Sequence, residues 1–245
     1  MDHGRLLNAV KFNNVKHESN VVKLSTVALE RGTIVSTALR LLDEVGLEKL
    51  TLRRLAAELG VQAPALYWHF RSKQELLDEM ADAIAVQEAP SLRPLAEGEP
   101  WEEWLAEWFR GRRRVFRSHR DTVRLTAGTH PGAETLRTAE TILESLVRAG
   151  FTPRDAMWGI GTLGNFLGGF VLEEQADQER GLVGQDKFEE ALEALAPYPH
   201  LRAVMADTGA PQSDAAFEHG LALILAGMRT RIEATRGMHK NDGDL

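Results

Sequence analysis

The spacing of the apolar residues is the feature that most constrains the fold of this chain. From Arg31 onwards apolar side chains recur every three to four residues, as Ile34, Val35 and Ala38 do, and this is the period of an amphipathic helix. No segment shows the alternation of apolar and polar residues that a half-buried strand requires. The sequence therefore predicts an all-α protein.

Capping residues divide this pattern into successive helices. Thr51, Ser72 and Thr152 each precede an apolar run with a hydroxyl that can accept a hydrogen bond from an early backbone N–H, and Ser72 with Glu75 matches a capping box. Residues 196–212 contain prolines and glycines and are predicted to form a loop. The predicted helices span about residues 31–45, 51–60, 62–70, 72–89, 101–118, 134–149, 152–178, 188–195 and 213–235, with a short segment from residue 121.

Prolines and glycines between residues 90 and 100 mark the clearest linker in the chain. Residues 1–30 lack a sustained period and are expected to form a mobile N-terminal extension, and residues 237–245 a flexible tail. Between them we expect an N-terminal three-helix domain over 31–78 and a larger helical domain over 79–236.

Composition excludes several classes of protein. The 245 residues contain no cysteine, which rules out a disulfide scaffold, a thiolate metal site and a cysteine nucleophile. No apolar run approaches the roughly 18 residues of a spanning helix, and the start lacks the pattern of a signal peptide, so we expect a cytoplasmic protein without a membrane partner. Although the net charge is −7, residues 1–73 carry 11 Lys and Arg against 7 acids. A basic end on an acidic body is typical of a nucleic-acid reader joined to another domain.

The second and third predicted helices, joined at Gly60 and Val61, have the layout of a helix-turn-helix motif. In this motif the first helix braces the second, which presents its exposed side chains to the major groove of DNA. The alternative is a helical hairpin with a hydrophobic turn.

The residues of this motif carry a resemblance to a known family. The run LTLRRLAAELGVQAPALYWHFRSKQELLDEMADAI resembles the DNA-binding domain of the TetR family of bacterial transcriptional repressors. The segments EGEPWEEWL, SHRDTVRLTAGTHP and RAGFTPRDAMWGIGTLGNFLGGFVLEEQ resemble the regulatory domain of its tetracycline-responsive members, in the same order, so that the resemblance covers about residues 31–235. It implies a homodimer that binds double-stranded DNA at a palindromic operator and is released by a small-molecule inducer, with the fourth helix linking the two domains. The positions matching DNA contacts are Thr51, Arg53, Gln62, Ala63, Pro64, Tyr67, His69 and Lys73.

The resemblance also implies a ligand pocket in the regulatory domain. Its positions correspond to Trp108, Arg112, Thr126, Thr129, His130, Pro131, Ile142, Asn165 and Glu173. Tetracycline-responsive members have a histidine at the position of Thr126, where it ligates the magnesium ion carried by the drug, and other drug contacts at Trp108, Arg112 and Ile142. We therefore expect an inducer other than tetracycline. Arg112 at a pocket position would suit a ligand with a carboxylate or a phenolate.

The two longest helices are expected to form a four-helix dimer interface, through Gly161, Gly164, Gly168, Phe217, Leu221, Ile224 and Met228. Residues 159–164 also satisfy the dinucleotide fingerprint GxGxxG, but they lie within a helix and follow no strand, so close helix contact is the favoured interpretation. We predict no cofactor, no metal site and no enzymatic activity, because neither histidine spacing nor any nucleophile or carboxylate motif supports one. Two alternatives remain. One is an activator of the same fold, and the other is a small-molecule carrier or enzyme with a structural N-terminal domain.

Overall fold

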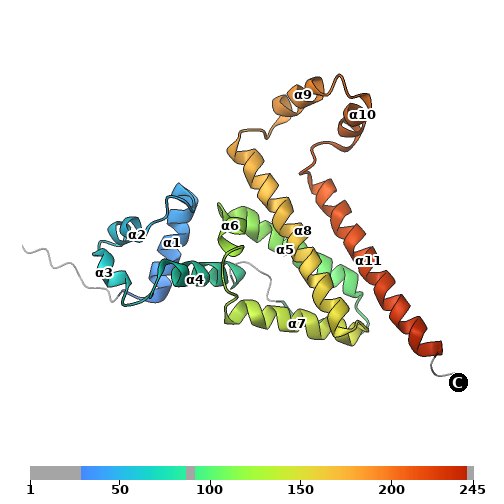
Figure 1. The fold of residues 1–245 in the computed structure, drawn as a ribbon, viewed down its shortest axis with the longest axis horizontal. Helices are drawn as coiled ribbons and strands as arrows, with labels where there is room; N and C mark the ends of the chain where they lie inside the picture. Colours follow the sequence, from blue (N-terminus) through green and yellow to red (C-terminus); the bar gives the residue numbers. More distant parts are fainter. Residues whose placement is uncertain (1–28, 87–91, 242–245) are drawn as a thin grey trace, which may run out of the picture.

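The computed structural model describes residues 29–86 and 92–241, and within these ranges the chain contains eleven helices and no strand (Figure 1). The prediction of an all-α protein is confirmed. No helix in the described ranges combines the length and the apolar character needed to cross a membrane. The helices are α1 Arg31–Val45, α2 Leu52–Glu58, α3 Ala63–Leu66, α4 Lys73–Val86, α5 Trp101–Ser118, α6 Thr122–Thr126, α7 Ala133–Ala149, α8 Pro153–Glu179, α9 Gln185–Ala194, α10 Pro199–Thr208 and α11 Asp214–Asn241.

Helices α1 to α4 form a small N-terminal domain, called the head below, at the left of Figure 1. The Thr51 hydroxyl accepts a hydrogen bond from the backbone N–H of Arg54 at 3.2 Å, which starts α2 as predicted. At the start of α4 the Ser72 hydroxyl accepts from the N–H of Glu75 at 3.1 Å. The Glu75 carboxylate in turn accepts from the N–H of Arg71 at 2.7 Å, and this bond is the main reason that the pKa of Glu75 is lowered.

The hydrophobic core of the head is closed by residues from the rest of the chain. Ile34, Leu55 and Met80 are fully or almost fully buried at its centre, and Val115 of α5 and Leu125 of α6 belong to the same cluster. The head therefore buries part of its apolar surface against the larger domain, and α4 contributes to this shared core along most of its length.

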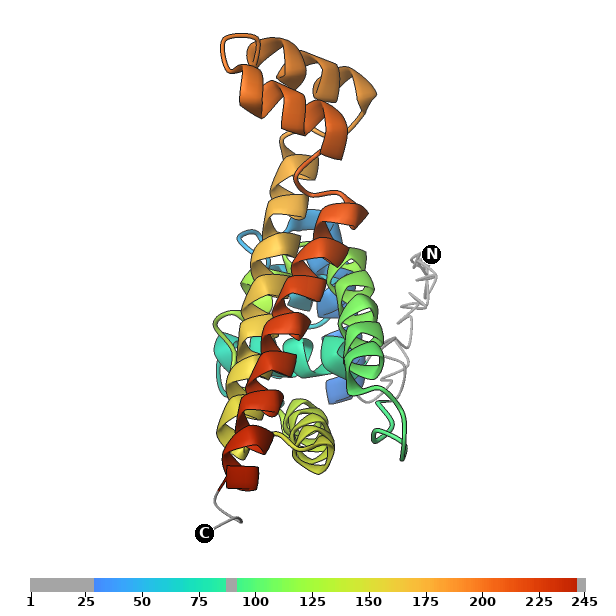
Figure 2. The same ribbon diagram turned by 90° about the vertical axis from the view of Figure 1, so that its right-hand side faces the viewer.

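The remaining helices form a larger body with its own core. Helices α8 and α11 lie side by side over most of their length, as Figures 1 and 2 both show, and α5 and α7 pack against α8. A Cβ atom added to Gly220 would lie 2.5 Å from Cζ of Phe166, so the approach of α11 to α8 requires a glycine there. Phe166 also stacks on Phe217 with ring centres 5.5 Å apart. Helices α9 and α10 extend beyond this pair and contain no buried residue.

Two predictions about the C-terminal third were wrong. Residues 196–212 do not form a loop throughout, because α10 occupies Pro199–Thr208. Pro199 occupies the first helical turn, where a missing N–H has no cost, and the helix ends at Gly209 with a φ of 78°. The last helix also continues past residue 235 to Asn241, into the predicted tail. Residues 1–28 and 242–245, which include most of the predicted extension, lie outside the described residues.

Candidate DNA-binding head and ligand cavity

Helices α2 and α3 form the helix-turn-helix of the head. Leu55, Ala56 and Leu66 are buried between the two helices, and Gly60 makes the turn with a φ of 67°, in the left-handed region that favours glycine. Helix α3 comprises only four residues, Ala63–Leu66, and is followed by turns up to residue 69, whereas the sequence predicted a helix to residue 70. The helix that would enter the major groove is thus only about one turn long.

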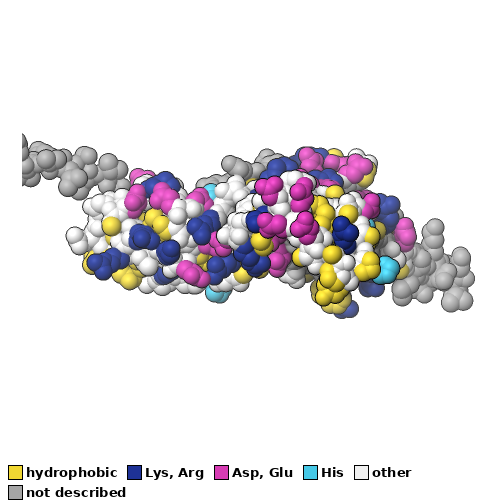
Figure 3. Space-filling view, turned by 90° about the horizontal axis from the view of Figure 1, so that it is seen from above, with side chains coloured by type: hydrophobic (Ala, Val, Ile, Leu, Met, Phe, Trp, Pro, Cys, Tyr) yellow, Lys and Arg dark blue, Asp and Glu magenta, His cyan; other side chains and the backbone are white. Residues whose placement is uncertain are grey.

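The basic residues of the head fall into two groups. Arg31 and Arg40 of α1 form ion pairs with glutamates, and for Arg40 the partners are Glu44 and Glu58. In contrast, Arg53 and Lys73 are exposed and make no ion pair with any described residue. Figure 3 shows Lys and Arg side chains spread over the head, which is at the left in that view. The unpaired cations are free to meet the phosphates of DNA.

Most of the predicted DNA contacts lie on the surface of the head. Thr51, Arg53, Gln62, Pro64, Tyr67 and Lys73 are exposed, and Ala63 and His69 are half-buried. Trp68 is 90% exposed, which makes it the most exposed large hydrophobic residue in the described chain. Trp68 is not among the predicted DNA contacts.

The body contains a cavity of about 440 Å³ between the end of α4, the middle of α5, the first half of α7 and the start of α8. Its walls are mostly apolar, and this size and character are typical of a small-molecule site. The lining residues are Ala85, Val86, Leu92, Trp108, Arg112, Glu134, Thr135, Arg137, Thr138, Ala139, Thr141, Ile142 and Ile160.

Two polar groups in the cavity wall have few partners. The Nε1 atom of Trp108 is buried and has no hydrogen-bond partner. The guanidinium of Arg112 donates one hydrogen bond, to the carbonyl oxygen of Ala85 at 3.3 Å, and lies over the ring of Phe116 at 4.7 Å. Burial lowers the pKa of Arg112 to about 10, because removal from water disfavours the charged form.

Helix α4 extends from the head to the wall of the cavity. Its last residues, Ala85 and Val86, line the cavity, whereas its first residue, Lys73, is one of the exposed cations of the head. Three polar contacts attach its first ten residues to the segment before α7 and to the first turn of α7. Gln74 donates to the carbonyl oxygen of Gly128 at 3.0 Å, Asp78 accepts from the N–H of His130 at 3.2 Å, and Asp82 accepts from the N–H of Thr135 at 3.1 Å.

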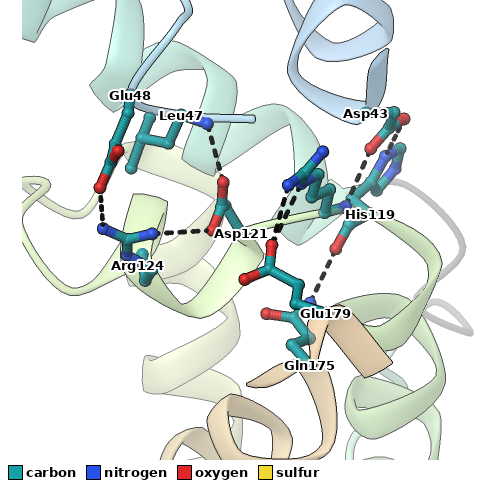
Figure 4. Close-up of polar contacts among 9 residues, drawn as sticks. Asp43, Leu47, Glu48, His119, Asp121, Arg124, Gln175 and Glu179 are labelled. Carbon is teal, nitrogen blue, oxygen red and sulfur yellow. Dashed lines mark hydrogen bonds and ion pairs between the residues drawn. The ribbon is translucent and has the colours of Figure 1, made fainter. Parts of the chain in front are cut away.

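A second set of polar contacts attaches α1 and the loop after it to the body (Figure 4). The Asp121 carboxylate accepts from the N–H of Leu47 at 2.8 Å and also contacts Arg124 at 3.3 Å. Arg124 in turn pairs with Glu48 at 3.0 Å. Asp121 is buried and has a left-handed backbone with a φ of 54°, so its conformation is fixed by these contacts.

The end of α1 makes a further link, also drawn in Figure 4. The Asp43 carboxylate accepts from the N–H of Arg120 at 2.9 Å and lies 3.0 Å from Nδ1 of His119. Gln175 of α8 donates to the carbonyl oxygen of His119 at 2.9 Å, and Arg120 pairs with Glu179 at 3.0 Å. The head is thereby connected through residues 119–121 to the long helix α8.

Comparison with known proteins agrees with this division into head and body. Residues 34–80 match the family described as bacterial regulatory proteins, tetR family, and residues 93–232 match the tetracyclin repressor-like C-terminal domain. The chain belongs to the TetR family. It is 40% identical, over 87% of its length and 98% of the relative's, to the tetracycline repressor protein class A from transposon 1721 of Escherichia coli.

Solved TetR-family structures share the fold of most of the chain. A possible TetR family transcriptional regulator from Streptomyces coelicolor superposes with a TM-score of 0.72 at 39% identity, covering 82% of this chain and 99% of that one. ActR from the same organism, in complex with actinorhodin, gives a TM-score of 0.69 at 32% identity over 82% and 97% of the two chains. As a TetR-family member the protein is a ligand-responsive transcriptional repressor and not an enzyme.

The structure brings three of the nine predicted pocket residues to the cavity, namely Trp108, Arg112 and Ile142. The others lie outside its lining. The Thr126 hydroxyl donates to the carbonyl oxygen of Thr122 within α6, and the Thr129 hydroxyl donates to that of Thr126. His130, Pro131, Asn165 and Glu173 are exposed.

The predicted dimer-interface residues divide between the two sides of α8 and α11. Phe217, Leu221 and Met228 are buried in the core of the body by contacts within one chain, and their assignment to a dimer interface stays a prediction. The apolar stripe of α11 faces α8 within the same chain, and the sequence alone cannot distinguish this from contact with another copy. Gly161 and Gly164 are exposed, and Gly168 and Ile224 are half-buried.

The sequence also missed the threonines of the cavity wall, Thr135, Thr138 and Thr141. They recur at helical spacing along α7 together with Ile142, and this polar stripe on an otherwise amphipathic helix is the signal that could have identified them.

Proposed function

We propose that this TetR-family protein acts as a homodimer that binds a palindromic operator through its two heads. The observation that carries the proposal is that Arg53 and Lys73, two exposed cations without an ion pair in the described chain, precede and follow α3. Arg53 lies in the first turn of α2 and Lys73 starts α4, so both can contact phosphates while α3 enters the major groove.

Selection of bound DNA from a random library would identify the operator. We expect a palindrome with half-sites about one helical turn apart. A salt titration then tests the contacts, since each phosphate contact adds roughly one unit to the slope of log affinity against log salt. Lys73→Ala should lower this slope by about one. Arg40→Ala removes the same charge from a residue already paired with Glu44 and Glu58, and it should leave the slope unchanged. Equal slopes for the two variants, or no enriched DNA, would contradict the proposal.

The outer face of α8 and α11 supports assembly into a dimer. A Cβ atom added to Gly161, Gly164 or Gly227 would meet nothing within 4 Å, so contacts inside the chain do not require glycine there. Each glycine inside a helix costs about 1 kcal/mol relative to alanine. Trp158 and Leu223, which are 63% and 62% exposed, lie on the same two helices. A second copy packing closely on this face accounts for both the glycines and the exposed apolar residues.

Gly164→Leu tests this interface. The added side chain has room in a single chain but would obstruct a second copy, so we expect a folded monomer with weakened operator binding in light scattering and gel-shift measurements. Gly32→Leu is the control, because Gly32 is also an exposed helical glycine with open space around it, but on α1. A Gly164→Leu protein that remains a dimer would exclude this face.

We further propose that the inducer is not tetracycline, although the Escherichia coli relative is named as a tetracycline repressor. Tetracycline-responsive members have their magnesium-ligating histidine at the position of Thr126, whose hydroxyl here donates to carbonyl oxygens within α6. A drug that binds through magnesium would therefore lack this protein ligand.

A further inference from the structure

Arg112 differs from Arg110 and Arg113, its neighbours on α5. Arg110 pairs with Glu218 at 2.6 Å, and Arg113 pairs with Glu174 at 2.6 Å. Arg112 lies between them in the sequence but lines the cavity. No described carboxylate forms an ion pair with it, and desolvation alone shifts its pKa. A buried guanidinium without a counter-charge is costly, because desolvation is not offset by an ion pair.

The charges around the cavity do not compensate Arg112. The other charged residues of the wall are Glu134 and Arg137, and these two pair with each other. A guanidinium has five N–H donors, and for Arg112 the described structure provides the carbonyl oxygen of Ala85 and the ring faces of Phe116 and Trp108. The cavity thus carries one net positive charge from Arg112, with most of its donors available.

Trp108 supplies a second unused donor beside the first. It precedes Arg112 by one helical turn, and the guanidinium carbon lies 5.9 Å from the centre of its ring. Its Nε1 atom is buried without a partner, which costs about 1 to 3 kcal/mol unless a ligand or water supplies an acceptor. Because both residues line the same cavity, one ligand that carries an anionic oxygen group and a neighbouring acceptor would offer a partner to each donor.

We propose that the cavity binds a mostly apolar small molecule that carries an anionic oxygen group, a carboxylate or a phenolate, paired with Arg112 and accepting from Trp108 Nε1. This inference rests on the proposed function, since it names the chemical class of the inducer. The side chains of Val86, Ile142 and Ile160 line the cavity and would contact the apolar part of the ligand. The Thr138 hydroxyl on the opposite helix offers a further polar contact.

The test compares each of two acids with a neutral analogue on the same ring skeleton, using the full-length protein without DNA. The probes are anthracene carboxylate and its carboxamide, and alizarin and its dimethyl ether. Titration calorimetry should show at least one acid binding about 10-fold to 100-fold more tightly than its neutral analogue, the range expected for a charge-assisted hydrogen bond. The two pairs distinguish a carboxylate from a phenolate.

Variants assign this preference to the two donors. Arg112→Met should abolish the preference for the acid, Arg112→Lys should retain part of it, and Trp108→Phe should weaken the acid several-fold. Arg137→Met is the matched control, because it removes a cavity arginine already paired with Glu134, and it should keep the preference. If Arg112→Met does not fold, the acid preferences of Arg112→Lys and Trp108→Phe decide whether the inference holds.

The inference is overturned if amide and ether bind as tightly as the acids, if neither acid binds at millimolar concentration, or if Arg112→Met keeps the preference. Operator binding by the unliganded protein is measured separately. Loss of operator binding with an intact acid preference would reject the proposed function alone. Intact operator binding without an acid preference would reject this inference alone.

Discussion

Replacing Asp121 by alanine tests whether the head and the body unfold as one unit. Asp121 starts α6, is only 7% exposed, and accepts the hydrogen bond that the Leu47 N–H donates across the domain boundary at 2.8 Å. Alanine keeps the chain length and removes the acceptor. It also places a residue with no polar side chain in a left-handed conformation with a φ of 54°.

The expected destabilisation can be worked out from these two losses. A hydrogen bond to a charged group contributes about 1.5 to 3 kcal/mol. The left-handed conformation costs alanine about 1 kcal/mol, whereas aspartate and asparagine tolerate it through local hydrogen bonds. We therefore expect Asp121→Ala to lower the free energy of unfolding by about 2.5 to 4 kcal/mol. Asp121→Asn keeps an acceptor oxygen and the tolerated conformation, so it should cost no more than about 1 kcal/mol.

Urea unfolding measures the loss of stability in both variants, and scanning calorimetry shows whether the head and the body still unfold together. Asp43 and Glu48 still connect the head to the body in the variant, so the heads should remain attached while the calorimetric transition broadens or divides into two. An Asp121→Ala protein within about 0.5 kcal/mol of the wild type, with a single sharp transition, would refute the reasoning. An asparagine variant as unstable as the alanine variant would show that the charge, and not the acceptor, is what matters.

Three further outcomes are expected. Glu174→Gln should cost about 2 to 3 kcal/mol in urea unfolding, below the range for an uncompensated buried ion, because Arg113 keeps Asp214 at 2.8 Å as a partner. The hydrogen bond from Arg93, followed by that from the N–H of Ala96, lowers the pKa of Glu99 from 4.5 to about 2. The stability from this group is therefore fully present above pH 4.5 and lost as the pH falls through about 2, and Glu99→Gln should flatten the decline of Tm in that window. Tetracycline with magnesium should leave the thermal midpoint unchanged, and a dose-dependent rise would contradict the proposal about the inducer.

Local chemistry made much of the fold predictable. Thr51 and Ser72 cap helices where the sequence placed them, because a cap depends on residues three positions apart. Pro199 misled the prediction because the same residue breaks a helix in its interior and is favoured in its first turn. Only the surrounding packing decides between the two.

The site was less predictable because cavities depend on distant contacts. Trp108 and Arg112 reach the cavity since they lie one turn apart on the same face of α5. Thr126 and Thr129 do not, because their hydroxyls bond to nearby carbonyl oxygens in and after the short helix α6. Periodicity likewise identified the apolar stripe with Phe217 and Leu221, but it could not say which partner the stripe would meet.

Helix α4 begins at Lys73 in the head and ends at Val86 in the cavity wall, and this arrangement has a thermodynamic consequence. If a ligand weakens operator binding by a given factor, the operator must weaken ligand binding by the same factor. The affinity of the cavity for its ligand is therefore not a single constant. A cell with many operator copies would need more ligand to reach the same occupancy, and calorimetry with and without operator DNA would give the coupling from either side.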